Sequence, residues 1–344
     1  MRVEDSGRGA RRLAMPQTSA TATAAGSAAR PGPSVAVRTR GLTKQYGPVR
    51  LTKRHGAVTA LDSLDLDVAA GEVLGFLGPN GAGKTTTIRL LLGLIRPTAG
   101  TAEVFGLDAQ TDKIAVHART AYVPGEATLW PSLTGAETLE LLARLQGRAD
   151  LEYRAELIRR FDLDTSTKVR AYSKGNRQKV NLIAALASRA DLLLLDEPTA
   201  GLDPVMEQAF RVCVREAAHR GQTVFLSSHV LSEVEALCDR VAILRRGRLV
   251  EIGTLAQLRH LSALMVEATF PGRPPDVTGI AGVSAVTITG HQLRCRVLGP
   301  VGDLLEVLAA ARPDSLLSRE PSLEELFLTI YGDPQDALAE GGDG

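Results

Sequence analysis

The chain has 344 residues, 44% of them hydrophobic and 23% charged, a composition typical of globular proteins and long enough for two domains. Lysine and arginine number 40 against 39 aspartates and glutamates, so the formal net charge is +1. No overall field therefore attracts nucleic acid or an anionic membrane. The longest apolar runs, such as residues 192–195, are much shorter than the roughly 20 residues that cross a bilayer. A role at a membrane would need a span from another chain.

The chain opens with a stretch, residues 1–34, of Ala, Thr, Ser, Gly and Pro with scattered Arg and no apolar periodicity, which predicts a disordered tail. Glu4, Asp5 and the lack of an apolar central region argue against an export signal.

The three cysteines, Cys213, Cys238 and Cys295, lie far apart and form no Cys-x-x-Cys pair, which fits a reducing compartment. We expect them to be buried as small apolar groups, with Cys213 and Cys238 in helices.

Residues 35–73 alternate like strands of an antiparallel sheet edge. Within this stretch, residues 42–47 are nearly repeated by residues 51–56, nine positions later. Further short strands are expected at residues 100–105 and 121–124.

A glycine-rich loop follows an apolar run at residues 71–77, which predicts a buried strand, and precedes apolar residues at helical spacing. Glycines let successive backbone N–H groups curl around phosphate oxygens, and the N-terminus of a helix adds its positive dipole end. Lys84 is expected to reach the outer phosphates and Thr85 to hold Mg²⁺. The loop has the pattern G-x-x-x-x-G-K-T and consists of Gly78, Pro79, Asn80, Gly81, Ala82, Gly83, Lys84, Thr85 and Thr86.

Three helices are expected after these strands. Thr134 and Glu137 form a capping box that opens a helix through Leu145, and a second helix covers residues 151–161. A third helix begins within residues 172–178, and its N-terminus offers a place for an anion.

The next stretch, residues 191–198, is a continuous apolar run that ends in two acids, as in a strand buried on both faces of a parallel sheet. Ligands of such sheets bind at the carboxyl ends of the strands. Asp196 and Glu197 are adjacent and point to opposite sides of the strand end, so one can face Mg²⁺ and the other a water. Residues 224–229 predict another strand with a polar end, and residues 242–252 predict a hairpin.

From about Thr254 the composition shifts to short strands and helices, which we interpret as a small α+β accessory domain. Strands are expected at residues 264–270 and 293–298 and a helix at residues 303–311. A capping box made by Ser322 and Glu325 predicts a last helix.

These motifs resemble, in order and interval, those of the nucleotide-binding subunit of ABC transporters, over residues 35 to about 253. Residues 78–86 look like its Walker A loop and residues 192–197 like its Walker B motif. Residues 172–178 look like its signature segment and residues 200–203 like its D-loop, while His229 looks like its switch histidine.

The resemblance implies an α/β fold: a P-loop NTPase core with an antiparallel β subdomain and a helical subdomain, plus the small C-terminal α+β domain. The chain would divide into a tail (residues 1–34), the ATPase domain (35–253, helical subdomain about 126–190), the accessory domain (254–332) and a second tail (333–344).

The family also implies a head-to-tail dimer that sandwiches two ATP molecules, each held by the Walker loop of one subunit and the signature helix of the other. Ser173 and Gly175 would then act across the dimer, with Asp203 of the D-loop at the same site. Hydrolysis would reopen the dimer and drive separate membrane subunits. The further roles that the family implies are water polarisation by Glu197, contact of His229 with the γ-phosphate, and Mg²⁺ binding by Asp196 and Thr85.

The family's adenine-stacking aromatic residue has two candidates here. Counting back from Gly78 at the family's usual interval leads to His55, whereas Tyr46 lies nine residues earlier in the repeated segment. Either ring can stack on adenine, and we favour His55 by register.

Two other motifs depart from the family. Its glutamine loop commonly has Gln after Tyr-x-Pro, but here Pro124 is followed by Gly125 and Glu126. Glu126 is our candidate for the metal-sensing role, because a carboxylate can approach Mg²⁺ or its water, and a solvated loop acid is the alternative. The signature carries Lys174 and Asn176 where Gly and Gln are usual.

Residues 122–134 and 322–332 look most like the ATPase of exporters whose permease is a separate chain, including drug and antibiotic exporters. The resemblance therefore implies an ATPase that uses ATP and Mg²⁺, pairs as a homodimer or with a related ATPase subunit, and sits on the cytoplasmic face of the plasma membrane through its permease. No nucleic acid partner is expected.

The alternative is a soluble ABC ATPase acting on ribosomes or nucleic acid. Ribosome-associated relatives usually carry two cassettes and DNA-repair relatives insert coiled coils, whereas this chain has one cassette and no heptad run. A P-loop kinase would not explain the signature segment or His229.

Overall fold

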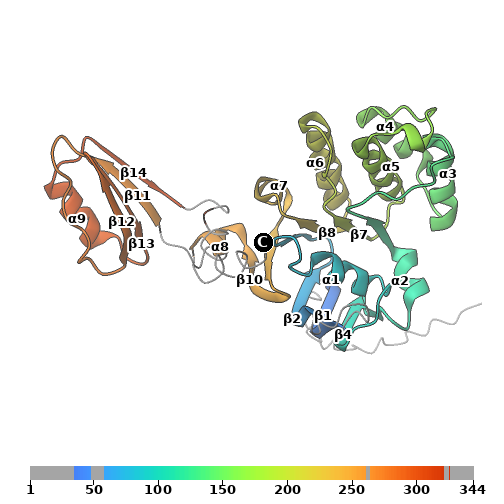
Figure 1. The fold of residues 1–344 in the computed structure, drawn as a ribbon, viewed down its shortest axis with the longest axis horizontal. Helices are drawn as coiled ribbons and strands as arrows, with labels where there is room; N and C mark the ends of the chain where they lie inside the picture. The colour runs from blue at the N-terminus through green and yellow to red at the C-terminus, as the bar shows by residue number, and fades with distance from the viewer. Residues whose placement is uncertain (1–34, 48–57, 261–263, 321–324, 326–344) are drawn as a thin grey trace, which may run out of the picture. The chain divides into compact units, whose positions relative to one another are not determined.

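The computed structural model describes residues 35–47, 58–260, 264–320 and 325. A six-stranded sheet of order β10-β9-β3-β8-β7-β6 forms the centre of the cassette (Figure 1). Strands β9, β3, β8, β7 and β6 pair in parallel, and β10 runs antiparallel to β9. The strands are β3 (Val73–Leu77), β6 (Thr120–Val123), β7 (Leu192–Asp196), β8 (Thr223–Ser228), β9 (Arg240–Arg245) and β10 (Arg248–Thr254).

This sheet is buried on both faces, because its residues alternate between two apolar clusters. In β7, Leu193 and Leu195 join the first cluster, and Leu192 and Leu194 join the second. A continuous leucine run therefore suits both faces at once, as the sequence predicts.

Helices cover the first face of the central sheet. This face packs against helices α3 to α7, whose buried residues lie in the same cluster (Figure 1). Their bounds are α3 (Gly135–Gln146), α4 (Leu151–Arg160), α5 (Lys174–Ala187), α6 (Pro204–His219) and α7 (Leu231–Leu237), with a short 3₁₀ turn η1 (Val169–Ala171) before α5.

The second face packs against helices α1 (Lys84–Leu91) and α2 (Lys113–Arg119) and against a four-stranded sheet of order β2-β1-β4-β5. Its strands are β1 (Val35–Tyr46), β2 (Val58–Ala69), β4 (Ala99–Val104) and β5 (Leu107–Asp108), and β1 pairs antiparallel with β2 and β4. The antiparallel strands predicted within residues 35–73 are thus confirmed for the described parts, 35–47 and 58–73.

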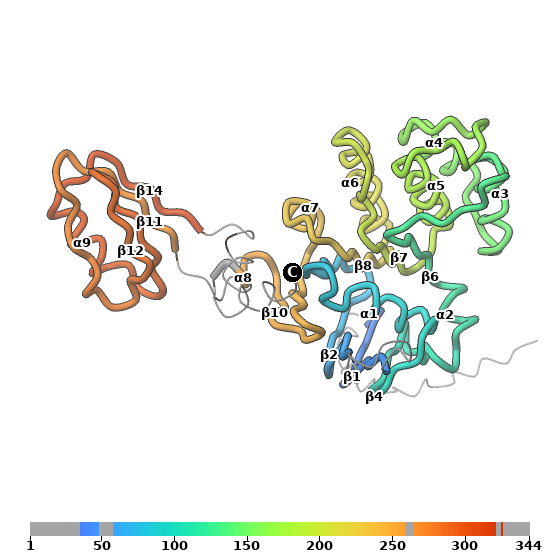
Figure 2. The backbone as a smooth tube through the Cα atoms, in the orientation of Figure 1, coloured from blue at the N-terminus to red at the C-terminus, as the bar shows by residue number. Residues whose placement is uncertain are grey.

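The helical block gathers α3, α4 and α5 into one group, which Figure 2 shows as neighbouring segments of the trace. Thr134 caps α3 with the predicted capping box: its hydroxyl accepts from the Glu137 N–H, and the Glu137 carboxylate accepts from the Thr134 N–H. Helix α5 is buried on nearly all sides rather than on the single face that its spacing indicates, because it lies between α3, α4 and the sheet.

The C-terminal part contains a third sheet of order β12-β13-β11-β14. Its strands are β11 (Leu264–Thr269), β12 (Val283–Thr289), β13 (Gln292–Val297) and β14 (Ser315–Arg319). In the chain, helix α8 (Leu255–His260) precedes β11, and helix α9 (Gly302–Ala310) lies between β13 and β14. Leu304 and Leu308 of α9 pack onto Val266 and Leu293. Strands β12 and β14 were not predicted; their residues are mostly exposed, although Val283 and Val286 of β12 pack against the core of this sheet.

All three cysteines are buried, as expected, but the helical assignment holds only for Cys213. Cys238 follows the end of α7 in an extended conformation. The division into ATPase and accessory domains remains our interpretation, and the predicted tails, His55 and most of the last helix lie outside the described residues. None of the described helices combines the length and the apolarity needed to cross a membrane.

Candidate functional site

The glycine-rich loop connects the end of β3 to the start of α1, as predicted. Gly83, which caps α1, has a φ of 111°, and a Cβ there would lie 2.5 Å from the Ala60 carbonyl oxygen. Only glycine fits this left-handed position against the backbone of β2. The loop therefore keeps its backbone N–H groups at the N-terminus of α1, where a phosphate is favoured.

Lys84 extends back along the loop. Its side chain is 5% exposed, and its Nζ donates to the carbonyl oxygens of Gly78 at 2.6 Å and Pro79 at 3.1 Å. The same Nζ lies 3.4 Å from Glu197 Oε1. The ammonium group thus stands between the loop and the end of β7.

Asp196 is buried at the end of β7, and each of its oxygens accepts a hydroxyl hydrogen bond. Thr85 Oγ1 donates to Oδ2 at 2.8 Å, and Ser227 Oγ donates to Oδ1 at 2.6 Å. The parallel register places Asp196 opposite Ser227 on β8. Since Thr85 lies in the first turn of α1, directly after the phosphate loop, this carboxylate joins the start of that helix to two strands of the sheet.

The neighbouring acid, Glu197, points elsewhere because its backbone adopts a left-handed conformation with φ of 47°. Its side chain is 25% exposed, and Oε1 lies 3.2 Å from Nδ1 of His229 as well as 3.4 Å from Lys84. The predicted division between the two acids is therefore seen in their contacts: Asp196 meets hydroxyls, and Glu197 meets cationic or ionisable nitrogen groups.

A hollow of about 490 Å³ opens between the phosphate loop, the end of β7 and the start of α5. Glu126 and Gly125 both line this hollow, and Glu126 is exposed there. The glutamine-loop segment therefore lies beside the candidate metal ligands. Tyr122 also lines it, and burial together with the negative charge of Asp196 raises the pKa of Tyr122 to about 12. The other lining residues are Asn80, Thr85, Arg89, Pro124, Thr128, Lys174, Asp196, Glu197 and Ala200.

The signature and D-loop segments contact each other within this one chain. Ser173 caps α5 through a hydrogen bond that its Oγ accepts from the Asn176 N–H at 3.1 Å. A Cβ on Gly175 would lie 2.4 Å from the Gly201 carbonyl oxygen. Asp203 caps α6, its Oδ1 accepting from two backbone N–H groups at 3.0 Å.

Of the two adenine candidates, only Tyr46 is described. It ends β1, is 40% exposed and pairs with Val58 of β2. Two residues further along β2, the Ala60 carbonyl packs against Gly83, so this end of the β1–β2 pair borders the phosphate loop. His55, which the register favours, falls outside the described residues.

The donor set at Asp196 suits Mg²⁺. Mg²⁺ prefers oxygen ligands and is usually held by one or two carboxylates plus substrate phosphates and waters. Thr85 Oγ1 and Asp196 Oδ2, 2.8 Å apart, supply a hydroxyl and a carboxylate on the phosphate side of the sheet edge. Among the described residues there is no group of three or more His, Cys, Asp or Glu that could hold a metal.

Sequence reasoning missed two buried residues that connect these motifs. Ser227 could have been found from strand register, since it lies near the end of the neighbouring strand, opposite Asp196. Gln178 of α5 donates from Nε2 to the carbonyl oxygens of Pro124 at 3.4 Å and Pro198 at 3.2 Å. It links the signature helix to two active-site loops across the fold, and no local pattern indicates such a contact.

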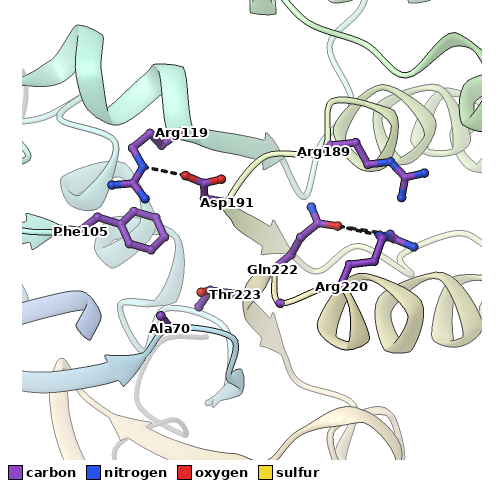
Figure 3. Close-up of a pocket in the computed structure, with 9 residues that line it drawn as sticks. Ala70, Phe105, Arg119, Arg189, Asp191, Arg220, Gln222 and Thr223 are labelled. Atoms are coloured by element: carbon purple, nitrogen blue, oxygen red, sulfur yellow. Dashed lines mark hydrogen bonds and ion pairs between the residues drawn. The ribbon is translucent and has the colours of Figure 1, made fainter. Parts of the chain in front are cut away.

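A second hollow, of about 430 Å³, lies at the opposite edge of the same sheet (Figure 3). Arg119, Arg189 and Arg220 line it, with Asp191 bonded to Arg119 Nε at 2.7 Å. Each arginine stands at or just after the C-terminus of a helix: α2, α5 and α6 respectively. Helix C-termini carry negative partial charge, so these arginine side chains neutralise the helix ends beside them. We assign no ligand to this hollow.

Comparison with known proteins agrees with this geometry. The family model for ABC transporters matches residues 61–200. A daunorubicin resistance ATP-binding protein of Streptomyces coeruleorubidus is 38% identical over 301 residues, covering 82% of this chain and 94% of that protein. A daunorubicin/doxorubicin resistance ATP-binding protein of Streptomyces peucetius is 40% identical over 321 residues, covering 88% and 94%.

Among solved structures, an ATP-binding subunit of an ABC transporter has a TM-score of 0.58 and 31% identity, covering 65% of this chain and 92% of that one. This likeness confirms the P-loop NTPase class of the fold. The chain therefore belongs to the ABC transporter family, as an ATP-binding protein with an ABC-type ATPase cassette.

Proposed function

We propose that this chain hydrolyses ATP to drive a separate transmembrane permease that exports drug or antibiotic molecules. The observation that carries the catalytic part is the meeting of Lys84, Asp196, Glu197 and His229 at one edge of the sheet, with 3.2–3.4 Å between Glu197 and its two neighbours. The export part rests on relatives named for drug resistance that share most of this chain. The alignments cover 82% and 88% of this chain, more than residues 35–253 contain, so the similarity extends into the C-terminal part.

Binding begins at the phosphate loop. The N–H groups at the start of α1 and the Lys84 ammonium bind the phosphates of ATP. Thr85 and Asp196 would hold Mg²⁺, and the ion would supply neutralisation of the charge on the phosphates. Ser227 keeps the Asp196 carboxylate oriented by donating to its other oxygen. Glu126, which lines the same hollow, would serve the metal-sensing role of the glutamine-loop segment.

Hydrolysis then needs a positioned water. Glu197 is the only one of the two acids whose carboxylate is directed away from the buried hydroxyls, so it orients and polarises the attacking water. His229, 3.2 Å from Glu197, contacts the γ-phosphate. Both groups act beside Lys84, and the reaction is mainly one of positioning and charge stabilisation.

A second cassette completes the site. Ser173 is exposed at the N-terminus of α5, where its hydroxyl and the neighbouring N–H groups can meet the γ-phosphate bound by another subunit. The D-loop with Asp203 packs against Gly175, so the two segments present one surface to that subunit. The partner is a second copy or a related ATPase chain, and the pair docks at the cytoplasmic face of the membrane through the permease.

Replacing the water-orienting acid tests the catalytic assignment. We expect Glu197→Gln to lower kcat for ATP hydrolysis by about 10²-fold or more, because the amide cannot take a proton from water. Binding of a fluorescent ATP analogue should persist, and a dimer should accumulate with ATP. The matched control Glu251→Gln, on exposed β10, should hydrolyse ATP like the parent. Retained hydrolysis in Glu197→Gln would remove the assignment.

Adding one methyl group tests the contact between signature and D-loop. In Gly175→Ala the new Cβ would lie 2.4 Å from the Gly201 oxygen, so one segment must shift. Because a misplacement of about 1 Å can cost about 10²-fold in rate, we expect a loss of kcat of about 10- to 100-fold with ATP affinity of the isolated chain unchanged. Gly302→Ala, where a Cβ meets nothing within 4 Å, is the control. Wild-type kcat in Gly175→Ala would show that the contact is dispensable.

The adenine platform is tested by comparing two alanine variants. We expect His55→Ala to weaken ATP binding about fivefold, as the loss of a stacked ring worth about 1 kcal/mol implies, and Tyr46→Ala to have little effect. Titration calorimetry measures both, and His55→Phe should restore affinity. A loss confined to Tyr46→Ala would transfer the role to Tyr46.

The export function is tested in cells that express the chain with its membrane partner. Affinity purification from detergent-solubilised membranes should yield a protein with several apolar spans of about 20 residues. Retention of fluorescent daunorubicin should fall with the wild-type pair and not with the Glu197→Gln pair. Recovery with ribosomes and no membrane protein would instead support the soluble alternative.

A further inference from the structure

Glu233 is a buried acid that the catalytic assignments leave unused. It lies in the first turn of α7, is 2% exposed, and one carboxylate oxygen, Oε1, has no hydrogen-bond partner among the described residues. Acids are common near helix N-termini because they interact with the helix dipole, but they are usually exposed. A buried carboxylate with an unpaired oxygen lowers the stability of the fold. This indicates that the contact made by its other oxygen, Oε2, has a role.

That contact is with Ser228, the residue before His229. Ser228 Oγ donates to Glu233 Oε2 at 2.7 Å and accepts from the Val230 N–H at 2.9 Å. The hydroxyl therefore ties the residues on both sides of His229 to one carboxylate. The Val230 carbonyl oxygen, at 3.4 Å from the same hydroxyl, is a weaker competing acceptor, since a charged acceptor at shorter distance dominates.

His229 itself depends on this backbone support. Its side chain is 52% exposed, and among the described residues the side-chain contact it makes is with Glu197, so packing does not hold it. The loop conformation from Ser228 to Val230 decides where its imidazole lies. Burial raises the pKa of the Glu233 carboxyl, and the Ser228 and Thr199 side chains oppose that rise. Thr199 directly precedes residues 200–203, so the acid also adjoins the D-loop.

We propose that Glu233 is a positioning residue for ATP hydrolysis, which holds the Ser228–His229–Val230 turn so that His229 stands beside Glu197. This inference rests on the proposed function of His229. It assigns Glu233 no contact with ATP. A shift of the turn would leave binding at the phosphate loop intact and slow the chemical step.

The test is steady-state ATPase kinetics of the full chain with Glu233→Met and Glu233→Gln. Glu233→Met keeps the side-chain length and removes the acceptor, and should lower kcat about tenfold with KM for ATP within about twofold of wild type. Glu233→Gln retains a carbonyl acceptor and should recover most of the loss. Glu235→Gln, on the same helix, is the control and should match wild type.

A double-mutant cycle separates positioning from general damage. If the acid acts through Ser228, adding Glu233→Met to Ser228→Ala should lower kcat little further. Circular dichroism and thermal unfolding report whether each variant is folded. Equal kcat in the Met and Gln variants, a rise in KM that accounts for the loss, or full additivity with Ser228→Ala would each overturn the inference. Because wild-type hydrolysis and the Glu197→Gln defect are measured in the same assay, failure here would leave the proposed function standing.

Discussion

The site depends on one buried carboxylate whose two oxygens are each satisfied by a hydroxyl. Asp196 is 3% exposed, and an unpaired charge at that depth would be strongly unfavourable. Thr85 and Ser227 supply the two hydrogen bonds only if the phosphate-loop helix and two parallel strands are in register. The strand order β3-β8-β7 meets this requirement, because β8, which carries Ser227, lies between the strand that leads to the loop and the strand that ends in the acid.

The contrast between Asp196 and its neighbour follows from the backbone. Glu197 has a φ of 47°, a conformation that costs about 1–3 kcal/mol for residues other than glycine. Two backbone hydrogen bonds hold it: the Glu197 N–H donates to the Ser227 carbonyl, and the Ala200 N–H donates to the Glu197 carbonyl. This turn ends the strand and directs the second carboxylate toward Lys84 and His229. One strand end thus provides two carboxylates with different surroundings.

Much of this arrangement was predictable from local patterns. The phosphate loop, the doubly buried leucine strand and the capping box of α3 are each encoded within about ten residues, and all three are confirmed. The contacts that were not predicted join residues far apart in sequence: Gly175 with Gly201, and Gln178 with two loops. Periodicity reports which face of an element is buried and does not report which neighbour it meets. Strands β12 and β14 were also missed: both are short and mostly exposed, so their pairing with β13 and β11 contributes more to their formation than burial does.

The two edges of the central sheet differ in the charges they carry, and the candidate site lies at one of them. In a parallel sheet with crossover helices, strand carboxyl ends coincide with helix N-termini, and strand amino ends coincide with helix C-termini. At the amino edge, Arg119, Arg189 and Arg220 (Figure 3) lie beside the negative C-terminal ends of α2, α5 and α6. The positive charges there are therefore balanced by helix ends of the same fold. At the carboxyl edge, the N-termini of α1 and α5 are positive, and the buried Lys84 ammonium lies 3.4 Å from the Glu197 carboxylate. Backbone N–H groups, an ammonium group and two adjacent carboxylates therefore meet at this one edge of the sheet, which is why the proposed chemistry is placed there.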